Sequence, residues 1–206
     1  MTTRLYLLRH GATSANLEVP YRLQGRGSDR SLNELGIDQA RRAGQALKHD
    51  KLAAVYSSPL ARAIETATKV AEGHELIPQV VAELTEADLG RWEGLTWDQA
   101  KWHDPQLYHQ FHANPGTVAY PEGESFAMVA DRVSPVLSAL ATTHPGASIA
   151  VVAHNVVNRA ILARFLNLPI NHAREIRQSN GGINILEYAN QVWTVLTLNS
   201  VFHLER

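Results

Sequence analysis

The chain has 206 residues, of which 45% are hydrophobic and 19% charged, an ordinary globular composition. Its formal net charge of -1 provides no broad basic field that would favour nucleic acid or a membrane surface. The lack of cysteine excludes disulfides, thiolate zinc sites and cysteine nucleophiles. No stretch approaches the ~20 apolar residues of a membrane span, and the N-terminus does not resemble a signal peptide. We therefore expect a single cytoplasmic domain over residues 1–206 that binds neither nucleic acid nor membrane.

The first part of the chain alternates between a strand, a loop and a helix. A short apolar run at 5–8 predicts a strand that ends at Arg9 and His10. Residues 11–31 are rich in Gly, Ser, Asn and Arg and predict a loop, and loops of that length are uncommon unless they bind something. The segment 33–48 begins with a capping asparagine and predicts an amphipathic helix.

The same alternation continues to the end of the chain. In chain order we expect a strand at 52–56, a helix that starts at 57–59, a short strand within 75–81, a helix at 124–142, a strand at 148–153, a helix at 156–165, and strands at 183–188 and 192–198. Such βαβ units favour an α/β fold, a three-layer sandwich with a mostly parallel central sheet and helices on both faces. Residues 90–123, rich in Trp, Pro and Gly, predict a partly helical lid insertion.

Three places in this pattern offer groups suited to phosphoryl transfer. A phosphate monoester is dianionic, so its transfer needs fixed cations, a nucleophile and an acid for the leaving oxygen. Arg9 and His10 stand at a strand end, where α/β sheets bind ligands, and a neutral imidazole is a competent nucleophile. Arg62 stands in the first turn of a helix, where free amides attract anions. His154 follows the strand at 148–153 in the same relative position as His10.

Each of these residues has a plainer interpretation when it is taken alone. Arg9 and His10 could be exposed polar residues at a strand end. Arg62 could pair at the surface with a glutamate of its own helix, which is the commoner case. His154 could be a core histidine with satisfied hydrogen bonds. Only the combination of the three places points to one site.

Several motifs resemble the histidine phosphatase superfamily, the phosphoglycerate-mutase-like proteins. The motifs occur in the family's order and span residues 4 to about 165, so that jointly they are highly specific. They are Leu8–Gly11 with Thr13 and Asn16, Leu23–Gly25 with Asp29 and Leu32, Gly36 with Gln39, Ser57–Ala63, Leu84–Glu86 with Gly90–Gly94, Pro121–Ser125, and Val152–His154.

The resemblance implies a role for each matched residue. His10 would be the nucleophile that becomes phosphohistidine, and Glu86 would be the general acid for the leaving group and then the base for water. The rest of the catalytic set would be Arg9, Arg62 and His154, and the substrate-binding set would be Asn16, Gln24, Gly25 and Thr13. No metal or organic cofactor is expected, because two arginines would supply the charge that Mg²⁺ supplies elsewhere.

The choice of the acid depends on the resemblance. Glu83, Asp88 and Glu93 lie close to Glu86, and spacing alone does not separate the four. The family pattern, in which the acid precedes a Gly-x-Trp-Glu-Gly block, selects Glu86. The chain departs from the family after His154, where Asn155 and Val156 replace the usual glycines and could narrow the pocket.

The leading function is hydrolysis of a phosphate monoester, in which the phosphoryl group moves to His10 and water then releases it. The alternative is a cofactor-dependent phosphoglycerate mutase, which uses the same phosphohistidine but must also bind the substrate carboxylate and exclude water. Lys101 is the only Lys or Arg between positions 92 and 131, and the chain ends soon after its last predicted strand; both points favour hydrolysis. A reservation concerns three loop arginines that could bind an acidic substrate, Arg22, Arg26 and Arg30.

A third function is a module that binds phosphorylated ligands without turnover. The joint presence of His10, Glu86 and the three other catalytic residues argues against it. The partner implied by the leading function is a small phosphorylated metabolite. The last two strands, 183–188 and 192–198, could provide the edge of a homodimer.

Overall fold

The fold is built on one six-stranded sheet in the computed structural model, which describes residues 1–205. The strands are β1 Thr3–Arg9, β2 Leu52–Ser57, β3 Gln79–Val80, β4 Ser148–Ala153, β5 Ile183–Ala189 and β6 Val192–Ser200. Their order is β3-β2-β4-β1-β5-β6; the first four pair in parallel, and β5 and β6 join antiparallel. The mostly parallel sheet is thus confirmed, although the strand expected within 75–81 is reduced to two residues.

The register between β1 and β4 brings two distant strand ends together. The strands lie side by side and parallel, with Arg9 opposite Ala153. The next residue after each of these is a histidine, His10 in one case and His154 in the other. Both imidazoles therefore leave the sheet at the same edge, which is the edge where α/β proteins bind ligands.

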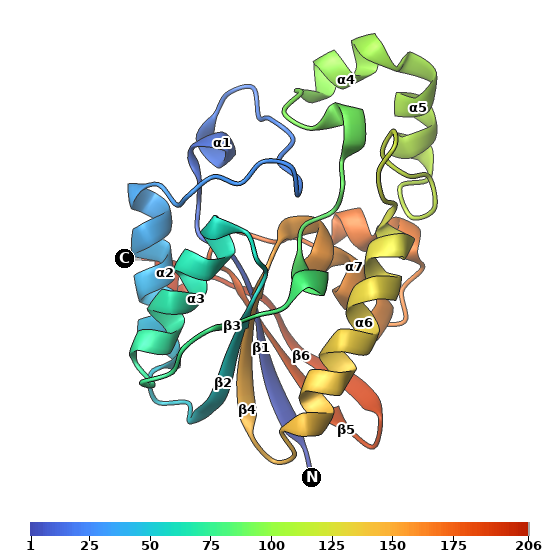
Figure 1. Cartoon of the computed structure of the whole chain (residues 1–206). Coiled ribbons are helices and arrows are strands. Elements are labelled where there is room, and N and C mark those ends of the chain that lie inside the picture. Colours follow the sequence, from blue (N-terminus) through green and yellow to red (C-terminus); the bar gives the residue numbers. More distant parts are fainter. Residues whose placement is uncertain (206) are drawn as a thin grey trace.

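Helices cover both faces of the sheet (Figure 1). One face carries α2 Glu34–Leu47 and α3 Ala61–Glu72, and the other carries α6 Phe126–Thr143 and α7 Asn155–Phe165. Side chains of β1 alternate between the two layers, because Tyr6 and Leu8 pack with α2 and α3 whereas Leu5 and Leu7 pack with α6 and α7. The predicted three-layer sandwich is confirmed. None of the helices within residues 1–205 combines the length and the apolarity that crossing a membrane requires.

Two predicted helix starts have different outcomes. Asn33 caps α2 as expected, since its side-chain oxygen accepts a hydrogen bond from the Gly36 amide at 2.8 Å. The next helix, α3, begins at Ala61, later than the predicted start at 57–59; its N-cap residue Leu60 has no side-chain cap, and the Ala61 amide donates to Oδ1 of Asp29 at 2.7 Å. The hydroxyl of Ser58 lies 2.7 Å from Nε2 of His154.

The predicted insertion at 90–123 stands above the carboxyl ends of the strands (Figure 1). It contains two short helices, α4 Trp97–His103 and α5 Pro105–Ala113. Trp92 is fully buried at its centre, with Phe111 and Tyr120 edge-on against the indole. The indole Nε1 donates to Oδ2 of Asp104 at 2.8 Å. The aromatic cluster of the insertion is therefore continuous with the main hydrophobic core.

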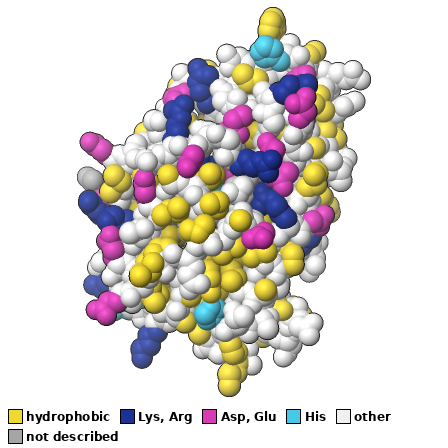
Figure 2. Space-filling view, viewed as in Figure 1, with side chains coloured by type: hydrophobic (Ala, Val, Ile, Leu, Met, Phe, Trp, Pro, Cys, Tyr) yellow, Lys and Arg dark blue, Asp and Glu magenta, His cyan; other side chains and the backbone are white. Residues whose placement is uncertain are grey.

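The first predicted loop, 11–31, contains one short helix, α1 Ser14–Leu17. Its arginines form ion pairs with acidic side chains at the surface: Arg22 and Arg30 with Glu18, and Arg26 with Asp88. On the face seen in Figure 2, basic and acidic side chains are interspersed. The charges of these three arginines are thus paired with carboxylates at the surface, and their binding of an acidic substrate stays a prediction.

Candidate active site

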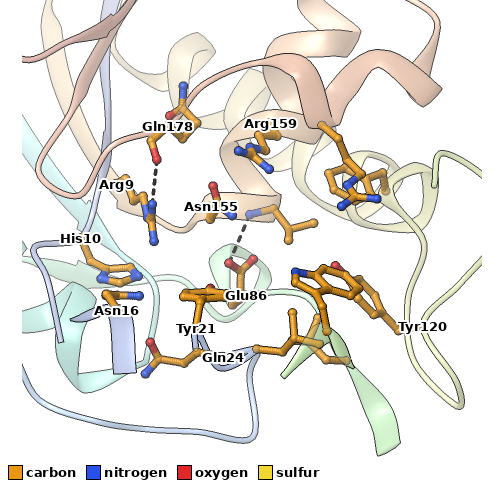
Figure 3. A pocket seen from close by; sticks show the side chains of 16 residues that line it. Arg9, His10, Asn16, Tyr21, Gln24, Glu86, Tyr120, Asn155, Arg159 and Gln178 are labelled. Atoms are coloured by element: carbon orange, nitrogen blue, oxygen red, sulfur yellow. Dashed lines mark hydrogen bonds between the residues drawn. The ribbon is translucent and has the colours of Figure 1, made fainter. Parts of the chain in front are cut away.

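A cavity of about 250 Å³ lies at the carboxyl ends of β1 and β4, where Arg9, His10 and Asn155 line it, and Figure 3 shows its lining side chains. It is smaller than the ~300–1,000 Å³ of sites for drug-sized ligands, so it suits a small molecule. Five of the predicted residues line it: Arg9, His10, Asn16, Gln24 and Glu86. The remaining polar lining comes from Tyr21, Tyr120, Asn155, Arg159, Arg174 and Gln178.

His10 is held as a neutral imidazole with one nitrogen free. Its Nδ1 lies 2.7 Å from the carbonyl oxygen of Gly11, and because a carbonyl only accepts, Nδ1 carries the proton. The lone pair is then on Nε2. Burial, followed by the charges of Arg9 and Arg62, lowers the pKa of His10 well below its ordinary value. The ring is therefore uncharged at neutral pH, with its single proton on Nδ1, which is the form a nucleophile requires.

His154 lies next to His10, with 5.2 Å between the ring centroids and 58° between the planes. The Ser58 hydroxyl accepts from the Leu60 amide at 3.3 Å and can donate its own proton to Nε2 of His154. The pKa of His154 is lowered by burial and then by the charge of Arg62, so this ring is neutral as well. Its Nδ1 is buried without a hydrogen-bond partner among residues 1–205 and is available as a donor to a ligand oxygen.

Two guanidinium groups lie near these rings without a carboxylate partner among the described residues. Arg9 donates from Nη1 to the Gln178 carbonyl at 2.7 Å, and its Nε is buried and unpaired within residues 1–205. Arg62 is fully buried and donates to the carbonyls of Ser28 at 2.6 Å and Gly25 at 3.1 Å. Burial lowers the pKa of both arginines, and the charge of the Glu86 carboxylate partly opposes this effect.

Glu86 is fixed at the start of α7. Its carboxylate accepts from the amides of Val156 at 3.2 Å and Val157 at 3.3 Å, and from the amide of Ala87 at 2.9 Å. A helix N-terminus holds a carboxylate through its free amides and its dipole. In Figure 3, Arg9 and His10 lie on one side of Glu86 and Tyr120 lies on the other. Glu86 thus occupies the middle of the cavity, between the nucleophile and the outer wall.

The structure separates Glu86 from the other candidate acids. Asp88 pairs with Arg26 at the surface and accepts from the Gly90 amide. Glu93 accepts from the amide of Gly25 at 2.7 Å. Neither carboxylate lines the cavity, and of the described acidic residues only Glu86 does.

Four predicted site residues do not line the cavity. Arg62 and His154 are fully buried beside His10, and Nε of Arg62 and Nδ1 of His154 have no hydrogen-bond partner among residues 1–205. The hydroxyl of Thr13 lies 3.1 Å from Oε1 of Gln24, so it positions a lining residue. Gly25 contributes only backbone groups, because its carbonyl accepts from Arg62 and its amide donates to Glu93. Thr13 and Gly25 therefore do not line the cavity, and their direct contact with substrate stays a prediction.

The outer part of the cavity contains residues that the sequence analysis missed. Arg159 is one of them. It lies four positions after Asn155 on α7, so helical periodicity would have placed it on the same helix face as Asn155, which the sequence analysis had noted. Arg174 and Gln178 come from 167–178, a segment with no strand or helix pattern. Arg174 lies on a 3₁₀ helix, Ile170–Glu175, and sequence offered no signal for it.

The chain is similar to known phosphatases over nearly its whole length. The family model of the histidine phosphatase superfamily (branch 1) matches residues 5–201. A metal-independent phosphoserine phosphatase of Arabidopsis thaliana is 34% identical over 207 residues, which cover 98% of this chain and 83% of that protein. A mycobacterial glucosyl-3-phosphoglycerate phosphatase structure is 30% identical with a TM-score of 0.87, covering 98% of this chain and 100% of that chain. Phosphoserine phosphatase of Entamoeba histolytica in complex with 3-phosphoglyceric acid is 26% identical with a TM-score of 0.87, over 98% and 100% of the two chains.

Proposed function

Since the chain belongs to the histidine phosphatase superfamily (branch 1), we propose that it hydrolyses small phosphate monoesters through a phosphohistidine formed on His10. The observation that carries this proposal is the state of the His10 ring. Its Nδ1 proton is donated to Gly11, and the ring is neutral and lines the cavity beside the unpaired Arg9. A nucleophile with its lone pair on Nε2 therefore faces a place that attracts a dianion.

In the first step, Nε2 of His10 attacks phosphorus while the bond between phosphorus and the leaving oxygen breaks. Glu86 gives its proton to that oxygen. Arg9, Arg62 and Nδ1–H of His154 stabilise the charge on the equatorial phosphoryl oxygens. The ring becomes positively charged on phosphorylation, and the Gly11 carbonyl continues to accept from Nδ1.

In the second step, water replaces the alcohol. The Glu86 carboxylate takes a proton from water as its oxygen attacks phosphorus, and the bond between phosphorus and Nε2 breaks. Inorganic phosphate leaves, His10 returns to its neutral form, and Glu86 is again protonated for the next turnover. No step needs a metal, because the arginines supply the positive charge.

A mutase remains a second candidate because of one observation. Lys101 is the only Lys or Arg between positions 92 and 131, but two arginines from elsewhere, Arg159 and Arg174, line the outer cavity. The missing positive charge that favoured hydrolysis over a mutase is therefore supplied from α7 and the 3₁₀ helix. Incubation of 3-phosphoglycerate with and without 2,3-bisphosphoglycerate separates the two, since hydrolysis releases phosphate whereas a mutase forms the positional isomer.

The proposal is tested by hydrolysis of p-nitrophenyl phosphate in the presence of EDTA. We expect turnover in the wild type and none in His10→Ala. His49→Ala is the matched control, because this histidine is exposed outside the cavity. Turnover that survives His10→Ala, or that appears only after Mg²⁺ is added, would refute the proposal.

A further inference from the structure

Two arginines of the outer cavity form no ion pair with the described residues. Arg159 lines the cavity from α7, and its Nε is buried without a hydrogen-bond partner within residues 1–205. Arg174 lines the cavity from the 3₁₀ helix. Neither forms an ion pair with a carboxylate of the described residues, unlike Arg164 on the same helix α7, which pairs with Asp131 at 2.6 Å.

The two guanidinium groups lie close enough to affect each other. Among charged groups, Arg174 has the largest effect on Arg159 and lowers its pKa, in addition to the effect of burial. Glu86 partly opposes this effect, but its carboxylate is already bound by the amides of α7. Holding two like charges together in a partly buried cavity is unfavourable unless a ligand brings an anion between them.

Arg174 is also fixed from the side of the insertion. Its guanidinium lies 5.3 Å from the Trp97 ring centroid and 5.5 Å from that of Phe111. Its Nη1 lies 3.1 Å from Nδ1 of His112, which must accept because arginine only donates. His112 is thus neutral with its proton on Nε2, and Arg174 is aimed by α5.

We infer that Arg159 and Arg174 bind a carboxylate of the substrate, and that His112 positions Arg174 for this contact. The inference rests on the proposed function and deepens it, since it assigns the substrate to phosphate monoesters that carry a carboxylate. The phosphate would lie at Arg9 and His10, and the carboxylate would lie at Arg159 and Arg174, which line the same cavity. The planar arginine forks match the two oxygens of a carboxylate. A cavity of about 250 Å³ limits the distance between the two anionic groups to that of a small metabolite.

The test compares two substrate pairs that differ in the carboxylate, namely O-phosphoserine with O-phosphoethanolamine, and 3-phosphoglycerate with glycerol 3-phosphate. For the wild type we expect kcat/KM to be about 10- to 100-fold higher on the carboxylate member of each pair. Arg159→Gln and Arg174→Gln should each reduce that ratio at least about tenfold. Arg164→Gln is the matched control on α7 and should leave the ratio unchanged. Because each ratio compares two substrates on one preparation, a loss of folded protein cancels.

The role of His112 is tested with two substitutions. Asn places an oxygen near the position of Nδ1 and retains the acceptor, whereas Leu removes it. We expect His112→Leu to raise KM for the carboxylate substrates several-fold with little change in kcat, and His112→Asn to restore the wild-type KM. Equal KM values for the two variants would overturn the positioning role.

The outcomes also separate this inference from the proposed function. Equal kcat/KM for both members of each pair would overturn the carboxylate assignment and leave the phosphohistidine proposal intact. Faster turnover of propane-1,3-diol bisphosphate than of 3-phosphoglycerate would assign the outer arginines to a second phosphate. That result would also overturn the carboxylate assignment. A lack of turnover with every phosphate monoester would refute both proposals.

Discussion

The imidazoles of His10 and His154 face each other 5.2 Å apart at the ends of two parallel strands, and each is oriented by a different oxygen. Gly11 accepts from Nδ1 of His10, whereas Ser58 contacts Nε2 of His154. The two rings therefore present opposite functions toward a ligand. His10 has a free lone pair, and His154 has a free N–H donor.

The contact between Ser58 and His154 predicts a graded effect of two substitutions. His154→Ala removes a donor to the phosphoryl group and should lower kcat/KM about 100-fold. Ser58→Ala leaves the ring in place but frees its tautomer, so we expect a loss of only about 3- to 10-fold. Steady-state kinetics with p-nitrophenyl phosphate measures both. A loss in Ser58→Ala as large as that in His154→Ala would contradict a role for the serine through the tautomer.

The lowered pKa of His10 predicts the acid side of the pH profile. The nucleophile must be neutral, so kcat/KM rises with pH until the ring has lost its proton. Because burial and the charges of Arg9 and Arg62 lower the pKa of His10, this rise should be complete below pH ~6.5, the ordinary value for histidine. Arg62→Gln removes one of the charges, so the acid limb should move to higher pH while the rate falls. An unshifted limb would contradict the electrostatic effect of Arg62.

Glu86 as the proton donor predicts a dependence on the leaving group. A nitrophenolate leaves without a proton, whereas an alkoxide needs one. Glu86→Gln should therefore lower kcat/KM for an alkyl phosphate by about 10²- to 10⁴-fold and for p-nitrophenyl phosphate by much less. Glu83→Gln serves as the control, since its side chain lies outside the cavity lining. Equal losses on both substrates would place Glu86 in binding and not in proton transfer.

The close approach of Gly11 to α2 predicts that its hydrogen atom cannot be replaced by a methyl group. A Cβ at this position would overlap with the carbonyl oxygen of Gly36. Gly11→Ala should lower the free energy of unfolding by about 1–3 kcal/mol and displace the carbonyl that orients His10. Gly27→Ala is the control, because a Cβ there would be 3.5 Å from the Glu93 side chain. Urea denaturation measures both, and equal stability of the two variants would contradict this view of the loop.

Much of the fold was predictable because its apolar patterns are local. The run at 5–8 and the run at 148–153 both proved to be adjacent parallel strands, and the polar residues after them proved to share one edge. The predictions for the start of α3 and for the strand within 75–81 were less accurate. Ser58 forms a hydrogen bond with His154, and only two residues of 75–81 join the sheet. Residues whose role is set by a distant partner do not reveal it in their own segment.

The inner and outer parts of the site differ in the same way. His10, Arg9 and Glu86 lie in motifs that resemble a family, and the structure places all three on one cavity. Arg174 lies in a 3₁₀ helix without apolar periodicity, and its orientation comes from aromatic rings of the insertion. Its contribution could be found only once the three-dimensional arrangement was known. The position of Arg159 could have been predicted from the sequence, because the helix α7 was predicted and its periodicity places Arg159 on the same face as Asn155.

The chemistry is tested most directly by trapping the covalent intermediate. The enzyme is mixed with p-nitrophenyl phosphate, whose leaving group needs no proton from Glu86, quenched in alkali within milliseconds, and digested, and the phosphorylated peptide is located by mass spectrometry. We predict one acid-labile phosphoryl group on His10, absent in His10→Ala and accumulating in Glu86→Gln, where attack by water is slowed. A phosphoryl group on any other residue, or steady turnover with no labelled enzyme at any time point, would contradict phosphoryl transfer through His10.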